Sequence, residues 1–262
     1  MKSYLSLVPI SAKVRKRQNR MTILCVIISI FLVTAIFSVA DMMIRTQSDR
    51  MTGKNGSWHI ELDGISQETA LKIAERDDVV SIGAVTIFNP DGELPYRMDG
   101  KRVVLYGIDE SYLTMNSTGA AEGRFPQGMG EIMLSSNAAR VLQVAVGDTV
   151  TLRTPSGDWD FTVSGLGGVE ESYYSGQYSL MDAYLPRTAF AALMEQNNVH
   201  NLQTSYYVQF TSASKAAKAI PELTAQHNLP ENAVSENTGV MAIAGQSDSS
   251  AAKNVYSLAA VL

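Results

Sequence analysis

The chain has 262 residues, of which 45% are hydrophobic and 18% charged, and its formal net charge is −5; this length suffices for one membrane anchor and one large or two small domains. All 26 acidic residues lie after residue 40, whereas six of the 21 basic residues lie within the first 20, so the part after the apolar segment carries a formal charge of −11. So acidic an exterior argues against a nucleic-acid partner and against docking on anionic lipid by charge alone.

The first predicted element is the uncharged apolar segment Met21–Ala40. At about 1.5 Å per helical residue it covers roughly 30 Å, the thickness of a bilayer's hydrocarbon core, so we predict a transmembrane helix over residues 21–44. The preceding residues 1–20 are basic, which places the N-terminus in the cytoplasm and the residues after Asp41 outside the plasma membrane. A signal peptide cleaved after Ala40 is the alternative, although the apolar run exceeds the usual length of such peptides.

Cys25 is the only cysteine and lies within the apolar segment. The outer part therefore has neither a disulfide nor a thiol, which fits a bacterial envelope protein better than a disulfide scaffold. Lipidation of Cys25 is not expected, because the three residues before it, Thr22-Ile23-Leu24, are not the small residues that such a site needs.

Beyond a helix extension and linker over residues 44–56, the chain predicts a strand, a helix and a returning strand. Trp58 to Leu62 alternates as a half-buried strand does, and Val79 to Phe88 reads as the second strand. Ser66 opens the helix between them, which extends to Arg76. Its apolar stripe is formed by Ala70, Leu71, Ile73 and Ala74. In a unit of this kind the two strands can lie parallel.

The turn sequence Asn89-Pro90-Asp91-Gly92 precedes a region of short strands and frequent glycine. We predict strands over 102–108, 149–154, 159–164 and 179–184, with short helices over 111–115 and 137–142, the latter capped by Ser135 or Ser136. The residues Pro155-Ser156-Gly157-Asp158 predict a hairpin. Gly165, Gly167 and Gly168 are expected to loosen the backbone before a tyrosine-rich loop.

The last part of the chain reads as a helix, a strand and a second helix. Pro186 begins a helix to about Gln196, and a strand covers 205–210. Ser212 or Ser214 caps a helix over 215–227, whose apolar face is Ala216, Ala219, Ile220 and Leu223. Val255–Leu262 is again apolar but too short to cross a bilayer, so we expect it to begin a second spanning helix of a longer protein.

Motifs of catalysis or cofactor binding are not found in the sequence. His59, His200 and His227 are scattered and have no ligand-type spacing, no G-x-S-x-G elbow occurs, and no G-x-x-x-x-G-K-[ST] loop occurs. We therefore expect a protein that is not an enzyme, with no catalytic residue, no bound cofactor and no metal site.

The best candidate for a partner contact is the glycine-flanked loop with Tyr173, Tyr174 and Tyr178 beside Glu170 and Glu171. Tyrosine rings with polar tips suit partner recognition. Aromatic packing over a sheet edge is the structural alternative, and the sequence leaves both open.

Three segments in the middle of the chain carry a family resemblance: Gly123-Arg124-Phe125-Pro126, Gly130-Glu131-Ile132-Met133-Leu134 and Val146-Gly147-Asp148-Thr149-Val150, followed by Phe161 to Gly165. In this order and spacing they resemble the outer domain of FtsX-like, MacB-type permeases of ABC transporters. Each motif residue also has a structural interpretation: Gly147 and Asp148 permit a tight reversal, and Glu131 lies near Arg124 and can pair with it.

The resemblance implies an α+β fold in which one N-terminal transmembrane helix is followed by a two-lobed extracytoplasmic domain over residues 45–252. Residues 57–88 and 202–250 would form a mixed α/β lobe, residues 89–201 an inserted β-rich lobe, and residues 253–262 the start of a second transmembrane helix. The implied partners are a separate ATP-binding subunit, membrane lipid, and a second permease copy in a homodimer or a paired permease.

The implied function is that of a permease subunit, which couples cytoplasmic ATP hydrolysis to export or extraction of a peptide, a lipoprotein or a lipid-like substrate, or to control of an envelope process. A membrane-anchored extracytoplasmic sensor is the alternative. Three or more further spanning segments beyond residue 262 would favour the permease, and a single helix followed by a signalling module would favour the sensor.

Overall fold

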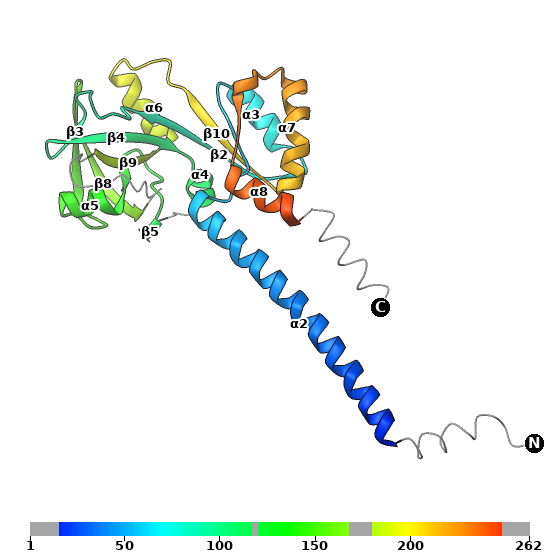
Figure 1. The fold of residues 1–262 in the computed structure, drawn as a ribbon. Helices are drawn as coiled ribbons and strands as arrows, with labels where there is room; N and C mark the ends of the chain where they lie inside the picture. The colour runs from blue at the N-terminus through cyan, green and yellow to red at the C-terminus, as the bar shows by residue number, and fades with distance from the viewer. Residues whose placement is uncertain (1–15, 117–119, 168–179, 248–262) are drawn as a thin grey trace, which may run out of the picture. The chain divides into compact units, whose positions relative to one another are not determined.

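The computed structural model describes residues 16–116, 120–167 and 180–247 (Figure 1). The chain divides into two compact units, which meet between Asp49 and Arg50. The first unit contains most of α2 (Lys16–Asn55), a helix of 40 residues. Within its segment Lys16–Met43, an 18-residue window has a mean hydropathy of 2.9, so this segment is long and apolar enough to cross a membrane.

The helix extension predicted after the apolar segment is confirmed, but the linker is wrong. α2 continues without interruption to Asn55, and β1 (Ile60–Leu62) begins five residues later. Gly53 lies inside α2, and nothing stands within 4 Å of the position that a Cβ would take there, so glycine is not required at this point. The helix ends instead at Gly56, whose φ of +81° suits a residue without a side chain.

The strands in the described part of the outer unit form one continuous sheet. It begins with four antiparallel strands in the order β11 (Val234–Glu236), β1, β10 (Thr204–Phe210) and β2 (Val79–Phe88), and β2 also pairs with the next strand, β4 (Lys101–Ile108). β1 and β2 run in the same direction, as predicted, but β10 lies between them and is antiparallel to both. The helices that follow β1 and β10 are α3 (Gln67–Ala74) and α7 (Ala213–His227). This β-α-β plus β-α-β arrangement is ferredoxin-like.

Ser66 and Ser212 cap α3 and α7 as predicted, each accepting a backbone N–H three residues later. The predicted apolar face of α7 is confirmed, since Ala216, Ala219 and Leu223 are buried and Ile220 packs against the same core. The predicted stripe of α3 is partly wrong, because Leu71 is 57% exposed while Ala70 and Ile73 are buried. With only eight residues, α3 presents a narrow stripe to the sheet, and Leu71 falls outside it.

Six strands of the second region form a closed ring. β4 (Lys101–Ile108) pairs with β3 (Arg97–Met98), and the ring continues through β7 (Thr149–Thr154), β8 (Gly157–Gly167) and β6 (Glu131–Leu134) to β9 (Leu180–Pro186), which returns parallel to β4. β5 (Ala120–Gly123) pairs with β8 outside the ring. The predicted hairpin is confirmed, with Thr154 opposite Gly157 and a loop of Pro155 and Ser156 between them.

Three helices accompany the ring, and its interior forms a core of its own. α5 (Ser136–Leu142) is capped by Ser135, α6 (Arg187–Gln196) follows Pro186, and α4 (Glu110–Met115) contacts β2. The largest buried cluster fills the ring with residues such as Leu105, Ile132, Leu152 and Phe161. The short elements η2 (Glu231–Ala233) and α8 (Thr238–Ser247) complete the described chain, and neither was predicted.

Candidate functional site

The structure does not test the predicted partner contact, because Tyr173, Tyr174 and Tyr178 lie outside the described residues. The same holds for the predicted start of a second spanning helix at 253–262. Across residues 16–116, 120–167 and 180–247, no three His, Cys, Asp or Glu side chains are grouped so that they could hold a metal ion.

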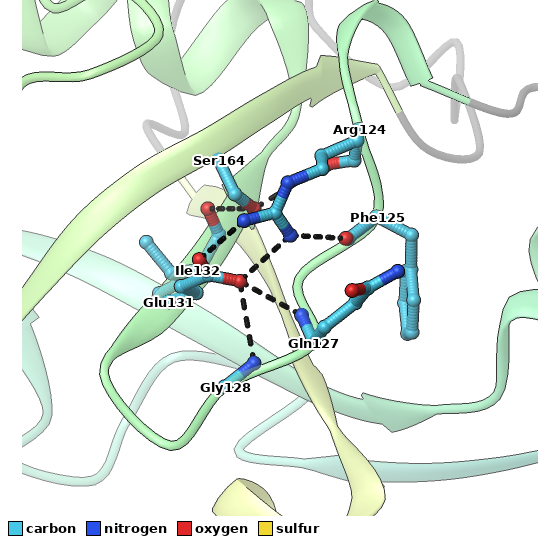
Figure 2. A network of polar contacts seen from close by, with 7 residues as sticks. All are labelled: Arg124, Phe125, Gln127, Gly128, Glu131, Ile132 and Ser164. Atoms are coloured by element: carbon cyan, nitrogen blue, oxygen red, sulfur yellow. Dashed lines mark hydrogen bonds and ion pairs between the residues drawn. The ribbon is translucent and has the colours of Figure 1, made fainter.

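The motif residues Arg124 and Glu131 form the ion pair that the sequence suggested. Arg124 Nη1 lies 2.9 Å from Glu131 Oε2 and Nη2 lies 2.5 Å from Oε1, so the pairing is bidentate (Figure 2). Glu131 Oε2 also accepts the backbone N–H groups of Gln127 at 2.8 Å and Gly128 at 3.2 Å. One carboxylate thus closes the loop between β5 and β6.

These contacts hold the pKa of Glu131 at about 2, mainly through the guanidinium of Arg124 and then through the N–H group of Gln127. The carboxylate is therefore fully charged at neutral pH and already saturated by donors. A carboxylate with these properties stabilises a loop and is poorly suited to accept a proton from a substrate.

The second half of the motif fixes the same loop to β8. Ser164 Oγ donates towards the carbonyl oxygens of Arg124 and Ile132, each at 3.3 Å. A Cβ at Gly165 would stand 2.4 Å from the Arg124 carbonyl oxygen, so only glycine permits this approach. The prediction that Gly165 and Gly167 loosen the backbone is therefore wrong: both continue β8, where Gly165 allows close packing.

The reversal at Gly147 and Asp148 is also as expected. Gly147 has a φ of +97°, and Asp148 Oδ2 accepts the N–H of Ala145 at 2.8 Å just before β7 begins. The motif is therefore mainly architectural, because the polar side chains of Arg124, Glu131, Asp148 and Ser164 bind backbone groups and one another. Two other motif residues, Thr149 and Val150, border a cavity.

Two cavities bordered by described residues indent the surface, one at the strand ring and one between α6, Thr86 of β2 and Thr204 of β10. The larger, of about 730 Å³, is bordered by Arg97 and Arg153, but Arg97 Nη1 donates to three backbone carbonyls and Arg153 lies 3.5 Å from Asp158. The smaller, of about 400 Å³, lies beside α6, where Arg187 stands 3.9 Å from Asp109. Polar side chains, among them Asp99, Thr149 and Thr151, border the larger cavity, but its two arginines already bind protein groups, so we assign no ligand to it.

The last residue of α2 and the three residues after it form a hydrogen-bonded connection to α4, which we call the α2 joint (Asn55 to Trp58 with Met115). It belongs wholly to the outer unit, which starts at Arg50. The Gly56 N–H donates to Thr52 O at 2.9 Å, and the Met115 carbonyl at the end of α4 accepts both the N–H of Ser57, at 2.5 Å, and its hydroxyl, at 3.2 Å. A Cβ at Gly56 would stand 2.7 Å from that carbonyl oxygen.

An aromatic cluster connects the α2 joint to the sheet. The Tyr207 ring lies edge-on to Trp58, with centroids 4.9 Å apart, and to Tyr112 of α4 at 5.0 Å. Its hydroxyl donates to Glu61 Oε1 at 2.8 Å. Burial raises the pKa of Tyr207 and that of Glu61, so the phenol remains a neutral donor. Local sequence patterns do not reveal this cluster, because its members come from distant segments: the connection after α2, β1, α4 and β10.

His59 lies next to the joint and is buried. Its Nδ1 accepts the Phe210 N–H at 3.1 Å, and burial lowers its pKa, so the ring is neutral with Nδ1 unprotonated. His59 thus serves as an acceptor within the sheet and not as a metal ligand.

Comparison with known proteins gives one family and related solved structures. The family model described as MacB-like periplasmic core domain matches residues 21–226. The fold is similar to the periplasmic region of MacB from Actinobacillus actinomycetemcomitans, with 15% identity, a TM-score of 0.50, and coverage of 72% of this chain and 92% of that one. A domain assigned to a permease protein from Porphyromonas gingivalis is 16% identical over 68% of this chain and 85% of that one, with a TM-score of 0.42. No curated protein matches.

Proposed function

The chain belongs to the family of MacB-like periplasmic core domains of ABC transporter permeases, and on this premise we propose that it transmits motion driven by cytoplasmic ATP hydrolysis to its outer unit. The ATP would be hydrolysed by a separate ATP-binding subunit, and this permease subunit would be present as a homodimer or as one of two paired permeases. The work done outside would be export or extraction of a peptide, a lipoprotein or a lipid-like compound, or control of an envelope process.

The observation that carries this proposal is the way in which α2 enters the outer unit. The helix has no break between its apolar segment and Asn55, and its end is fixed to α4 by two donors on one carbonyl. A continuous helix with a hydrogen-bonded end can pass on a displacement, whereas a flexible linker would absorb it.

We also propose a division of the chain around this joint. Residues 1–20 would be cytoplasmic and 21–44 would span the membrane, since the basic flank precedes the apolar segment. The α/β lobe would comprise 57–88 and 202–250, with 89–201 inserted as the β-rich lobe. The separate buried clusters of the ring and of the α3–α7 sheet support this division.

The test is a flexible Gly/Ser insertion at Gly53 in the full-length permease, assembled in nanodiscs with the ATP-binding subunit that co-purifies with it. The matched control carries the same insertion between Pro155 and Ser156, in an exposed hairpin loop. Hydrogen exchange of the outer unit is compared between nucleotide-free and vanadate-trapped complexes. We expect the nucleotide-dependent difference to disappear with the Gly53 insertion and to persist in the control; an unchanged difference in both would refute transmission through α2.

The tyrosine-rich loop remains a proposed partner contact on sequence grounds. Replacing Tyr173 and Tyr174 with serine should abolish the cellular activity of the transporter without lowering the thermal unfolding midpoint of the chain. If activity and folding both survive, this loop does not contact a partner.

A further inference from the structure

One side chain outside the family motif connects the end of α2 to the start of α8. Asn237 stands between β11 and α8 and is only 4% exposed. Its Nδ2 donates to the carbonyl oxygens of Asn55 at 3.1 Å and Trp58 at 2.9 Å. Both donors of one amide are therefore used on the α2 joint.

The other polar atoms of Asn237 bind α8 and His59, the residue before β1. Its Oδ1 accepts the Val240 N–H at 3.4 Å, and its backbone carbonyl accepts the N–H groups of Val240 and Met241 at 3.0 and 2.9 Å, which makes Asn237 the residue that caps α8. Its own N–H donates to His59 O at 2.9 Å. We call the set of bonds from Asn237 to Asn55, Trp58 and Val240 the Asn237 bridge.

Close packing beside the bridge supports direct contact between the two helices. A Cβ at Gly239 in α8 would stand 2.0 Å from Asn55 Nδ2, so the first turn of α8 approaches the Asn55 side chain as closely as a glycine allows. Hydrogen bonds and packing therefore join α8 to the last residue of α2 in two independent ways.

We propose that Asn237 is a positioning residue that couples α2 directly to α8, so that a load on one helix reaches the other without passing through the strand ring. This inference rests on the proposed function, because it names the residue through which the motion would pass. The sequence after α8 suggests where the motion would lead. Val255–Leu262 is apolar and uncharged, and a second spanning segment is predicted to begin there.

The chemistry of the bridge requires an amide. Serine at this position keeps an oxygen that can cap α8 but cannot donate to two carbonyls at once, and aspartate removes both donors and buries a charge. Asn237→Ser therefore breaks the coupling bonds while leaving an α8 cap in place.

A second buried asparagine provides the matched control. Asn89 is also 4% exposed, and its amide donates to Val103 O at 2.8 Å and accepts the Leu94 N–H at 2.9 Å, in the turn after β2. Asn89→Ser removes comparable hydrogen bonds at a site that does not touch the α2 joint. Both variants should lower the unfolding midpoint, and a merely structural role for Asn237 predicts no further difference between them.

The experiment uses the same permease–ATPase complex and follows hydrogen exchange at the amides of Val240 and Met241. In the wild type and in N89S we expect trapping with ATP and vanadate to change these exchange rates. In N237S we expect basal exchange at the same two amides to rise about tenfold. We also expect the nucleotide-dependent change to disappear in N237S while ATP hydrolysis continues. If N237S does not assemble, Gly239→Ala, which displaces the Asn55 side chain, should show the same loss.

The outcomes separate the two proposals. If the wild type shows no nucleotide-dependent change anywhere in the outer unit, the proposed function fails. If the wild type shows the change and N237S, or G239A in its place, retains it at α8, transmission stands and the role of Asn237 is refuted.

Discussion

The replacement Gly56→Ala tests the construction of the α2 joint most directly. Gly56 has a φ of +81°, in the left-handed region that costs an L-residue roughly 1–2 kcal/mol. The added methyl would also stand 2.7 Å from the Met115 carbonyl oxygen and 2.8 Å from Trp58 Cδ1, so backbone that anchors Ser57 has to shift. With at least one weakened hydrogen bond at about 1 kcal/mol, the expected loss is about 2–3 kcal/mol.

Gly53→Ala is the control, inside α2 and three residues before Gly56. Nothing lies within 4 Å of its Cβ position, and alanine is preferred to glycine inside a helix by about 0.5–1 kcal/mol, so this variant should be slightly stabilised. The measurement is thermal unfolding of the whole chain in detergent, followed by near-UV circular dichroism. For an outer unit of this size the Gly56→Ala loss corresponds to a decrease of roughly 4–12 °C in the midpoint. Equal midpoints for the two variants would show that the joint is not strained by a side chain at residue 56.

Three further predictions test the motif, the sheet and the core. Glu131→Gln should lower the free energy of unfolding by about 1 kcal/mol at pH 7. Because the pKa of Glu131 lies at about 2, the carboxylate's contribution to stability is complete above pH 4.5 and is lost as the pH falls towards 2. The unfolding midpoints of wild type and variant should therefore converge near pH 2. His59→Asn keeps an acceptor for the Phe210 N–H and removes an imidazole whose pKa is lowered from 6.5 by burial. As the pH falls below 6.5, the imidazole takes up a proton in the unfolded state before it does so in the folded state, so wild-type stability should decline. In urea titrations between pH 7 and 5, the stability of the variant should decline less. Ile73→Ala should lower the free energy of unfolding by about 2–5 kcal/mol and Leu71→Ala by less than about 0.5, because the Ile73 side chain is fully buried and that of Leu71 is 57% exposed. Similar urea midpoints for the two variants would contradict this placement of α3.

The elements that the sequence predicted correctly are those with local signals. Ser66 and Ser212 predict helix starts because an N-cap requires only one side chain and the backbone of the next three residues, so its signal is local. The turn after Phe88 is likewise local, since Gly92 N–H donates to Asn89 O within four residues. The burial of Leu71 was predicted wrongly because the 3.6-residue period alone does not fix how wide a face the sheet covers.

The closure of the strand ring could not be predicted from local patterns. It depends on β9 pairing in parallel with β4, which places Arg102 opposite Leu180, and on β3, a strand of only two residues. A strand of two residues is too short to show a hydrophobic periodicity. The pairing of strands that are distant in the chain also cannot be predicted from the hydrophobic pattern of a single sequence.

The candidate sites divide in the same way. The pairing of Arg124 with Glu131 was predictable, because seven residues separate them and their charges are opposite. Asn237 was not, because an asparagine in a polar stretch usually marks a turn, and its role depends on burial against residues about 180 positions earlier. The functional candidates in this outer unit are therefore the residues that a motif search passes over.

The strengths of these contacts determine how the Asn237 bridge can act. Its two bonds to the α2 joint contribute about 1 kcal/mol each, whereas each fully buried side chain of β1, such as Ile60 or Leu62, contributes about 1.5–3 kcal/mol. Under load the bridge therefore opens before β1 leaves the sheet. A bond of 2.9 Å is lost beyond about 3.5 Å, so the bridge tolerates only a displacement well below 1 Å. The bridge thus registers load through its opening rate rather than through a visible movement, which is why hydrogen exchange at α8, and not a distance measurement, is the decisive test of its role.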